Sequence, residues 1–206
     1  MTMYNTNYID ADKLNGLMKE IWAIATSKGW HENPISKGQY LGLVVTEAAE
    51  AVEADRVDKR AKTDMMAKVI KIQSESNIGL SQGWYETWFE VYYDIYIKGS
   101  VEEEFADTII RILDMTWELH GEKMDWAGYD PYGENYDKNE KFIETFWTFT
   151  KDILNCGTMN ITDSVAFIYS WAEHGCGISP ETLDMHIRWK MKKNELRPYK
   201  HGNKKY

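Results

Sequence analysis

The stretch SVEEEFADTIIRILDMTWELHG, Ser100–Gly121, decides the fold of this chain. Ser100 is a typical N-cap, Glu103 stands where it would complete a capping box, and Gly121 suits a left-handed stop. These signals predict one helix over the whole stretch. At about 100° per residue, one face of this helix is apolar and suits a core: Phe105, Ile109, Ile112 and Leu113. Another face carries charged residues: Glu104, Asp107, Arg111 and Asp114.

A second segment, LVVTEAAEAVEADR, repeats this design with Glu47 and Glu50 one turn apart beside an apolar face. Carboxylates that border an apolar stripe are costly to place unless a cation lies between them. The two helices therefore predict a shared divalent metal site formed by Glu47, Glu50, Glu104 and Asp107. Carboxylate oxygens alone suit a hard ion, Mg²⁺ or else Mn²⁺, and the Glu-x-x-His motif of di-iron bundles is absent from the sequence.

The composition predicts a single all-α domain over residues 1–206. Hydrophobic residues make up 43% of the chain, and only 4 prolines occur among its 206 residues. We expect a four-helix-bundle-type core with additional helices, and an ordered loop over residues 122–138. The remaining expected helices cover residues 10–28, 37 to the mid-fifties, 63–73, 84–97, 139–154, 161–174 (with Gly175 as the stop) and 180–195.

The charge is unevenly distributed. Residues 190–206 carry a net +6, whereas the whole chain carries −9. The acidic body argues against a nucleic acid partner, and the basic tail is either a solvated end or a segment that meets phosphates. No apolar run approaches membrane-spanning length, and the 2 cysteines have neither metal-ligand spacing nor disulfide density. We expect a cytoplasmic protein with no membrane partner.

The residues resemble a known family at three places. Glu47-Ala-Ala-Glu50 followed by Glu104-Phe-Ala-Asp107 is similar to the ExxE…ExxD signature of the all-α nucleoside triphosphate pyrophosphatases, the MazG-like and dimeric dUTPase superfamily. Lys190-x-x-x-Asn194-x-x-Arg197 resembles the phosphate-contacting motif near the C-terminus of that superfamily. The resemblance covers about residues 10–56, 100–115 and 183–206.

The resemblance implies Mg²⁺-dependent hydrolysis of a (d)NTP to (d)NMP and pyrophosphate. Glu47 or Glu50 would take the proton of the attacking water, and Lys190, Asn194, Arg197 and His201 would bind the substrate. The superfamily also implies a homodimer or higher homo-oligomer. Asp114, on the same face of its helix as Asp107, would support the ligands, contact the nucleotide, or pair with Arg111 or another cation.

One departure from the family pattern lies between the two carboxylate motifs. The family joins them by a short hairpin, whereas here residues 51–103 intervene. We read residues 58–99 as an inserted helical pair or lid, which leaves substrate class open. The alternative function is a non-catalytic helical protein that senses nucleotides or binds a partner while retaining the fold.

Overall fold

The computed structural model describes residues 10–75, 81–121, 123–124, 126, 141–155 and 161–200. These residues form helices and no strands, so the all-α prediction is confirmed. The helices are α1 (Ala11–Ser27), α2 (Lys37–Arg56), α3 (Thr63–Glu75), α4 (Gln82–Tyr96), α5 (Val101–His120), α6 (Phe142–Leu154), α7 (Ile161–Ser170) and α8 (Pro180–Leu196), with a π-helical turn, Trp171–Gly175, after α7. None of them is both long and apolar enough to span a bilayer.

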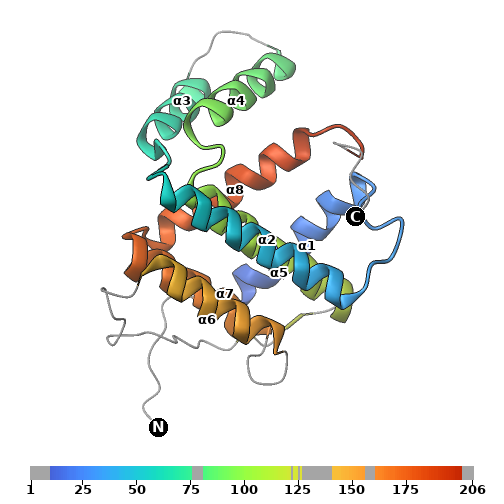
Figure 1. Ribbon diagram of the computed structural model, residues 1–206. Coiled ribbons are helices and arrows are strands. Elements are labelled where there is room, and N and C mark those ends of the chain that lie inside the picture. Colours follow the sequence, from blue (N-terminus) through green and yellow to red (C-terminus); the bar gives the residue numbers. More distant parts are fainter. Residues whose placement is uncertain are drawn as a thin grey trace.

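Helix α5 is the centre of the fold. It packs against α1, α2, α7 and α8, and Figure 1 shows α2 lying along it with α8 on the other side. Of its 20 residues, 14 are buried, including Glu102, Glu103, Glu104 and Asp114. The sequence predicts one buried stripe, but neighbouring helices cover α5 on nearly all sides. Burying a carboxylate is costly unless a cation or a hydrogen-bond donor reaches it.

The ends of α5 follow the sequence signals with one difference. Ser100 Oγ accepts a hydrogen bond from Glu103 N at 3.2 Å, and Gly121 closes the helix with φ 66° and its N–H on the Trp117 carbonyl. The Glu103 carboxylate accepts the N–H of Gly99, one residue before the cap. The predicted capping box is therefore only half formed, and Glu103 is held in place for other contacts.

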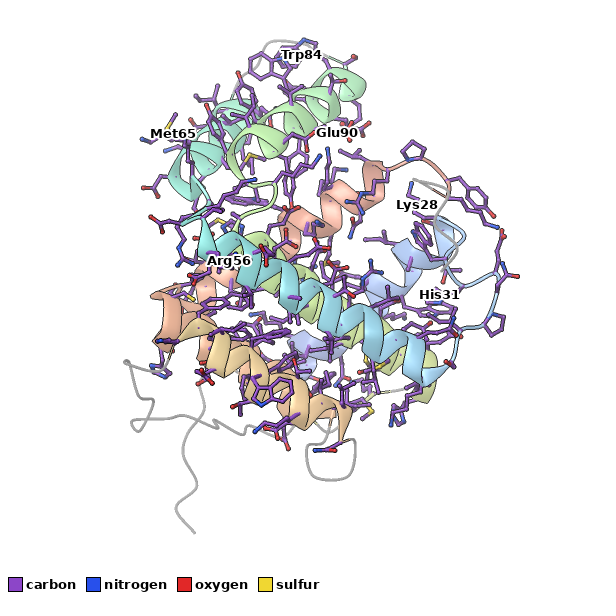
Figure 2. The ribbon with its side chains drawn as sticks, in the orientation of Figure 1. Lys28, His31, Arg56, Met65, Trp84 and Glu90 are labelled. Carbon is purple, nitrogen blue, oxygen red and sulfur yellow. The ribbon has the colours of Figure 1, made fainter. Side chains whose placement is uncertain are left out.

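A helical hairpin, α3 and α4, projects from the rest of the molecule (Figure 1). It has a small core of its own, to which Met66, Phe89 and Tyr93 contribute, and Trp189 of α8 joins this core. Figure 2 shows Glu90 on the side of α4 nearest α8, where it pairs with Lys193 at 3.2 Å. The expected helical pair within residues 58–99 is therefore present, and it is fastened to α8.

The end of α7 differs from the prediction. The sequence places the helix stop at Gly175, but the π-helical turn runs through that residue and the chain turns at Gly177, with φ 70°. Gly177 N and Ile178 N donate to the carbonyls of Glu173 and Ala172. Gly175 and Gly177 are separated only by Cys176, and the left-handed conformation that ends the helix is adopted at Gly177 rather than at the predicted Gly175.

Helix α8 also meets the hairpin through a buried histidine. His186 is fully buried, and its Nε2 lies 2.9 Å from Thr63 Oγ1 at the start of α3. Its Nδ1 has no hydrogen-bond partner among the described residues. Burial lowers the pKa of His186 from 6.5 to about 4, against a weak opposing effect of the Glu103 charge. The ring is neutral in the folded protein at neutral pH.

Replacing His186 with Gln should remove an acid-sensitive element of stability. Between pH 6.5 and pH 4 the unfolded chain binds a proton at His186 that the folded chain does not, so the free energy of unfolding falls as the pH falls. The full effect is roughly 3 kcal/mol. Urea denaturation of both proteins across this range should show the wild type losing that much more stability than His186→Gln. Parallel pH profiles would contradict the buried, neutral ring.

Candidate metal centre

Three carboxylates from two neighbouring helices converge beside the core. Glu47 of α2 and Glu104 and Asp107 of α5 each place one oxygen within 4.8 Å of the others. Because α2 packs along α5, side chains one turn apart on α5 meet a single position of α2. The sequence predicts this meeting, and the three oxygens could hold a metal ion.

Among the three carboxylates, Glu104 gives the strongest indication of a cation site. It is 6% exposed, and no hydrogen bond or ion pair from any described residue reaches its carboxylate. Burial, together with the nearby charges of Asp107 and Glu103, raises the pKa of Glu104 to about 9. A buried carboxyl group with no partner is costly. A cation bound between Glu104 and its two neighbours would remove this cost.

Glu103, which precedes Glu104 on α5, is already neutralised by a buried lysine. Lys190 of α8 pairs with Glu103 at 2.6 Å and with Asp107, and its side chain is only 6% exposed. The Tyr93 hydroxyl donates to Glu103 at 2.9 Å. Although burial alone would raise the pKa of Glu103, Lys190 and these hydrogen bonds lower it. Glu103, Asp107 and Lys190 therefore form a buried ion triad.

Asp107 thus belongs to both groups. Burial raises its pKa above the usual range, while Lys190 opposes this rise. One of its oxygens accepts from Lys190, and Asp107 also offers an oxygen to the three-carboxylate group. The lysine therefore fixes the position of a candidate metal ligand.

Glu50, the fourth predicted ligand, lies outside the three-carboxylate group. Its side chain is exposed on α2, but its charge contributes to the raised pKa of Glu104, so the two carboxyls are near each other. The structure thus brings together three of the four predicted ligands. The role of Glu50 as a ligand or as a base stays a prediction.

The predicted substrate-binding residues lie on and after α8. Lys190 is engaged in the ion triad, and Asn194 has a buried Oδ1 without a hydrogen-bond partner among the described residues. Burial raises the pKa of Tyr93 and the Arg197 charge opposes this rise, which places Arg197 near the Tyr93 hydroxyl. His201 lies outside the described residues. Phosphate binding by these residues stays a prediction.

The described part of the basic tail lies against the turn after α1. Lys200 N donates to the Lys28 carbonyl at 3.0 Å, and the Lys200 ammonium pairs with Glu32. Gly29 has φ 80°, and a Cβ there would lie 2.7 Å from the Tyr199 ring, so only glycine permits this approach. The chain therefore packs against the turn after α1 as far as Lys200, whereas a solvated end would need no such contacts.

A second polar group lies further along α5. Asp114 Oδ1 is 3.0 Å from Nε2 of His31, a residue of the α1–α2 connection labelled in Figure 2. The Trp22 ring stacks on His31 with centroids 5.6 Å apart, and the Tyr40 hydroxyl lies 3.3 Å from His31 Nδ1. Burial lowers the pKa of His31, but Asp114 and Glu118 together outweigh burial and the net shift is upward. The partner of Asp114 is thus His31 rather than Arg111.

Sequence reasoning missed two members of the site. Glu103 was expected only as a capping residue, and Arg111 only as a partner for Asp114. Instead Arg111 Nε donates to Glu47 Oε1 at 2.9 Å. The run of three glutamates at the start of α5 was the available signal for Glu103, since three adjacent residues of a helix point in different directions. Nothing local marks the contact between Arg111 and Glu47.

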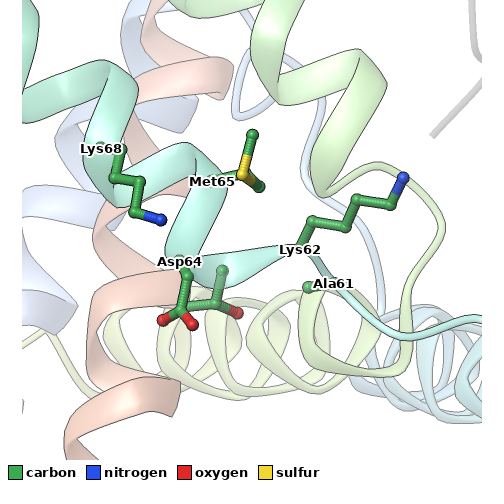
Figure 3. Close-up of a pocket in the computed structure, with 6 residues that line it drawn as sticks. Ala61, Lys62, Asp64, Met65 and Lys68 are labelled. Atoms are coloured by element: carbon green, nitrogen blue, oxygen red, sulfur yellow. The ribbon is translucent and has the colours of Figure 1, made fainter.

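Two surface hollows lie away from the three carboxylates. One, of about 410 Å³, lies at the start of α3 and is lined by Ala61, Lys62, Thr63, Asp64, Met65 and Lys68 (Figure 3). The other, of about 500 Å³, lies between the end of α2 and the start of α6. Neither is lined by Glu47, Glu104 or Asp107. The candidate centre is therefore defined by its charges rather than by either hollow.

Comparison of the chain with known protein families, curated proteins and solved structures gives no match. The likeness to the all-α pyrophosphatases thus depends on the carboxylate and Lys-Asn-Arg motifs quoted from the sequence.

Proposed function

We propose that this chain is a Mg²⁺-dependent nucleoside triphosphate pyrophosphohydrolase that converts a (d)NTP to a (d)NMP and pyrophosphate. One observation carries the proposal: Glu104, buried and without a hydrogen bond or ion pair to a described residue, converges with Asp107 of the same helix and Glu47 of the facing helix α2. The motif spacing supports the nucleotide as substrate, and the donor set of carboxylate oxygens supports Mg²⁺, with Mn²⁺ as a substitute.

The three carboxylates would hold the ion. Bound there, Mg²⁺ would neutralise phosphate oxygens and the charge that develops on the leaving pyrophosphate. Glu50 suits the role of general base, because it is exposed beside Glu104 and has no ion pair or hydrogen bond to a described residue. Glu47 suits it less, because its carboxylate accepts from Arg111.

Residues of α8 and its extension would position the phosphates. No described residue forms a hydrogen bond or ion pair with the Arg197 guanidinium, which can therefore form a two-pronged contact with phosphate oxygens. Asn194, in the last turn of α8, has a buried amide oxygen without a partner among the described residues, and its NH2 group would donate to a phosphate oxygen. These two residues lie one turn apart, so a single bound triphosphate can reach both.

The homo-oligomer and the cytoplasmic location are also proposals. Helix α6 exposes three large apolar side chains at helical spacing, Ile143, Trp147 and Leu154, with exposed fractions of 47%, 57% and 52%. A surface of this kind is typical of contacts between protein chains, and it supports a second copy as the partner.

The test is a panel of dNTPs and NTPs incubated with the full chain and Mg²⁺. Formation of a nucleoside monophosphate together with pyrophosphate is expected, and a chelator should abolish it. Release of orthophosphate would contradict the proposed position of cleavage. Nucleotide binding without turnover on the whole panel would favour the non-catalytic sensor instead.

A further inference from the structure

Arg111 occupies an unusual position beside the three carboxylates. Its Nε donates to Glu47 Oε1 at 2.9 Å, and its side chain is 34% exposed. No described residue accepts a hydrogen bond from either of its terminal η nitrogens. A guanidinium that is anchored through Nε keeps its other N–H donors in a fixed plane. Arg111 therefore presents unused donors next to the candidate metal centre.

Lys190, the other cation near the three carboxylates, is not available to an incoming anion in this structure. Lys190 is buried and pairs with both Glu103 and Asp107, so its ammonium is already neutralised. A phosphate could recruit Lys190 only by breaking two buried ion pairs, which is costly. Arg111 has one carboxylate partner and remains accessible. Among the cations on the two helices that carry the carboxylates, Arg111 is placed to meet an incoming anion.

We propose that Arg111 binds phosphoryl oxygens of the substrate next to the metal centre. This inference rests on the proposed function for the identity of the substrate, and it adds a binding residue on α5 to those expected after α8. The chemistry is that of a two-pronged contact between a guanidinium and a phosphate group. Glu47, which accepts from Nε, orients the guanidinium and keeps its η nitrogens toward the anion.

A purely structural role for Arg111 makes a different prediction. If Arg111 served only to hold Glu47 in place, its removal would weaken metal binding and anion binding together. If it binds phosphate, Arg111→Gln frees the Glu47 carboxylate from its only cationic partner among the described residues. Metal binding should then hold or strengthen while phosphate binding weakens. The two roles therefore differ in the direction of the change in metal affinity.

The experiment compares wild type, Arg111→Gln and Arg111→Lys as full chains. Mn²⁺ binding is measured by electron paramagnetic resonance, and binding of inorganic tripolyphosphate in saturating Mg²⁺ by calorimetry. Arg111→Gln should bind tripolyphosphate about ten- to a hundredfold more weakly, since a charge-assisted contact is lost. Its Mn²⁺ affinity should be unchanged or higher. Arg111→Lys keeps the charge without the fork and should fall between the two.

The matched control is Arg56→Gln. Arg56 is an exposed arginine of α2 that pairs with Glu53, and its loss should change neither affinity. Equal tripolyphosphate binding by wild type and Arg111→Gln would overturn the inference, and so would a parallel loss of Mn²⁺ and tripolyphosphate binding. If the wild type binds tripolyphosphate through Arg111 but hydrolyses no nucleotide, only the proposed function fails. If the wild type binds no tripolyphosphate, the inference about Arg111 fails, and the nucleotide panel alone decides the proposed function.

Discussion

Glu104→Gln is expected to reduce Mg²⁺-dependent nucleotide hydrolysis by about a hundredfold or more. The reason is that removing one metal ligand weakens metal binding, and with it the electrostatic stabilisation of the reaction. Glutamine has nearly the same shape, so α5 should keep its packing against α2 and α8. The change removes one of three candidate carboxylate ligands that lie within 4.8 Å of one another. The measurement is the initial rate of pyrophosphate release at saturating nucleotide and a range of Mg²⁺ concentrations.

Two comparisons separate this effect from general damage to the fold. Glu53→Gln removes an exposed carboxylate of α2 that pairs with Arg56, and it should leave the rate unchanged. In metal-free buffer the thermal midpoint of Glu104→Gln should equal or exceed that of the wild type, because a buried carboxyl without a partner has been removed. Full activity of Glu104→Gln would refute the assignment of the metal centre.

The helices of this fold could be predicted because their signals are local. The cap at Ser100, the stop at Gly121 and the Ser179-Pro180 start of α8 all act within a few residues. The apolar periodicity then shows which residues the core needs. The stop after α7 was misplaced because the choice between Gly175 and Gly177 depends on how the chain packs, which no local signal reports.

The part of the candidate site that could be predicted is the part marked by carboxylate pairs within a single helix. Glu47 and Glu50 form a recognisable pair one turn apart on α2, and Glu104 and Asp107 form another on α5. Pairing between distant segments is different. The contact of Lys190 with Glu103 joins residues 87 positions apart, and that of His31 with Asp114 joins residues 83 positions apart. Such contacts follow from the packing of α8 and the α1–α2 connection against α5, which composition and periodicity do not specify.

The hairpin of α3 and α4 is a further example of contacts that local signals do not predict. Its two helices were predictable, but its attachment to the body was not, since it depends on Tyr93 reaching Glu103 and on Lys193 reaching Glu90. Both contacts lead to α8 or to the ion triad. The hairpin is therefore coupled to the candidate metal centre through side chains that the sequence pattern assigned to packing or to the surface.

Lys190→Met is expected to lower the free energy of unfolding by about 3–5 kcal/mol, because it leaves two buried carboxylates without their cation. Methionine fills a similar volume, so the loss reports charge rather than a cavity. Glu103 would keep the Tyr93 hydroxyl and the Gly99 N–H, whereas Asp107 would lose its ion pair. Urea denaturation in metal-free buffer measures the change.

Three further variants test the cause of this loss. Lys192→Met, at a lysine that is 37% exposed and pairs with Glu195, should change stability by less than about 0.5 kcal/mol. Lys190→Arg keeps the charge, and the double variant Lys190→Met with Glu103→Gln removes one of the two orphaned carboxylates, so both should recover part of the loss. Mg²⁺ should also stabilise Lys190→Met more than it stabilises the wild type, because Asp107 is then free to share a bound cation with Glu47 and Glu104. A Lys190→Met protein as stable as Lys192→Met would show that the ion triad does not hold α8 against α5.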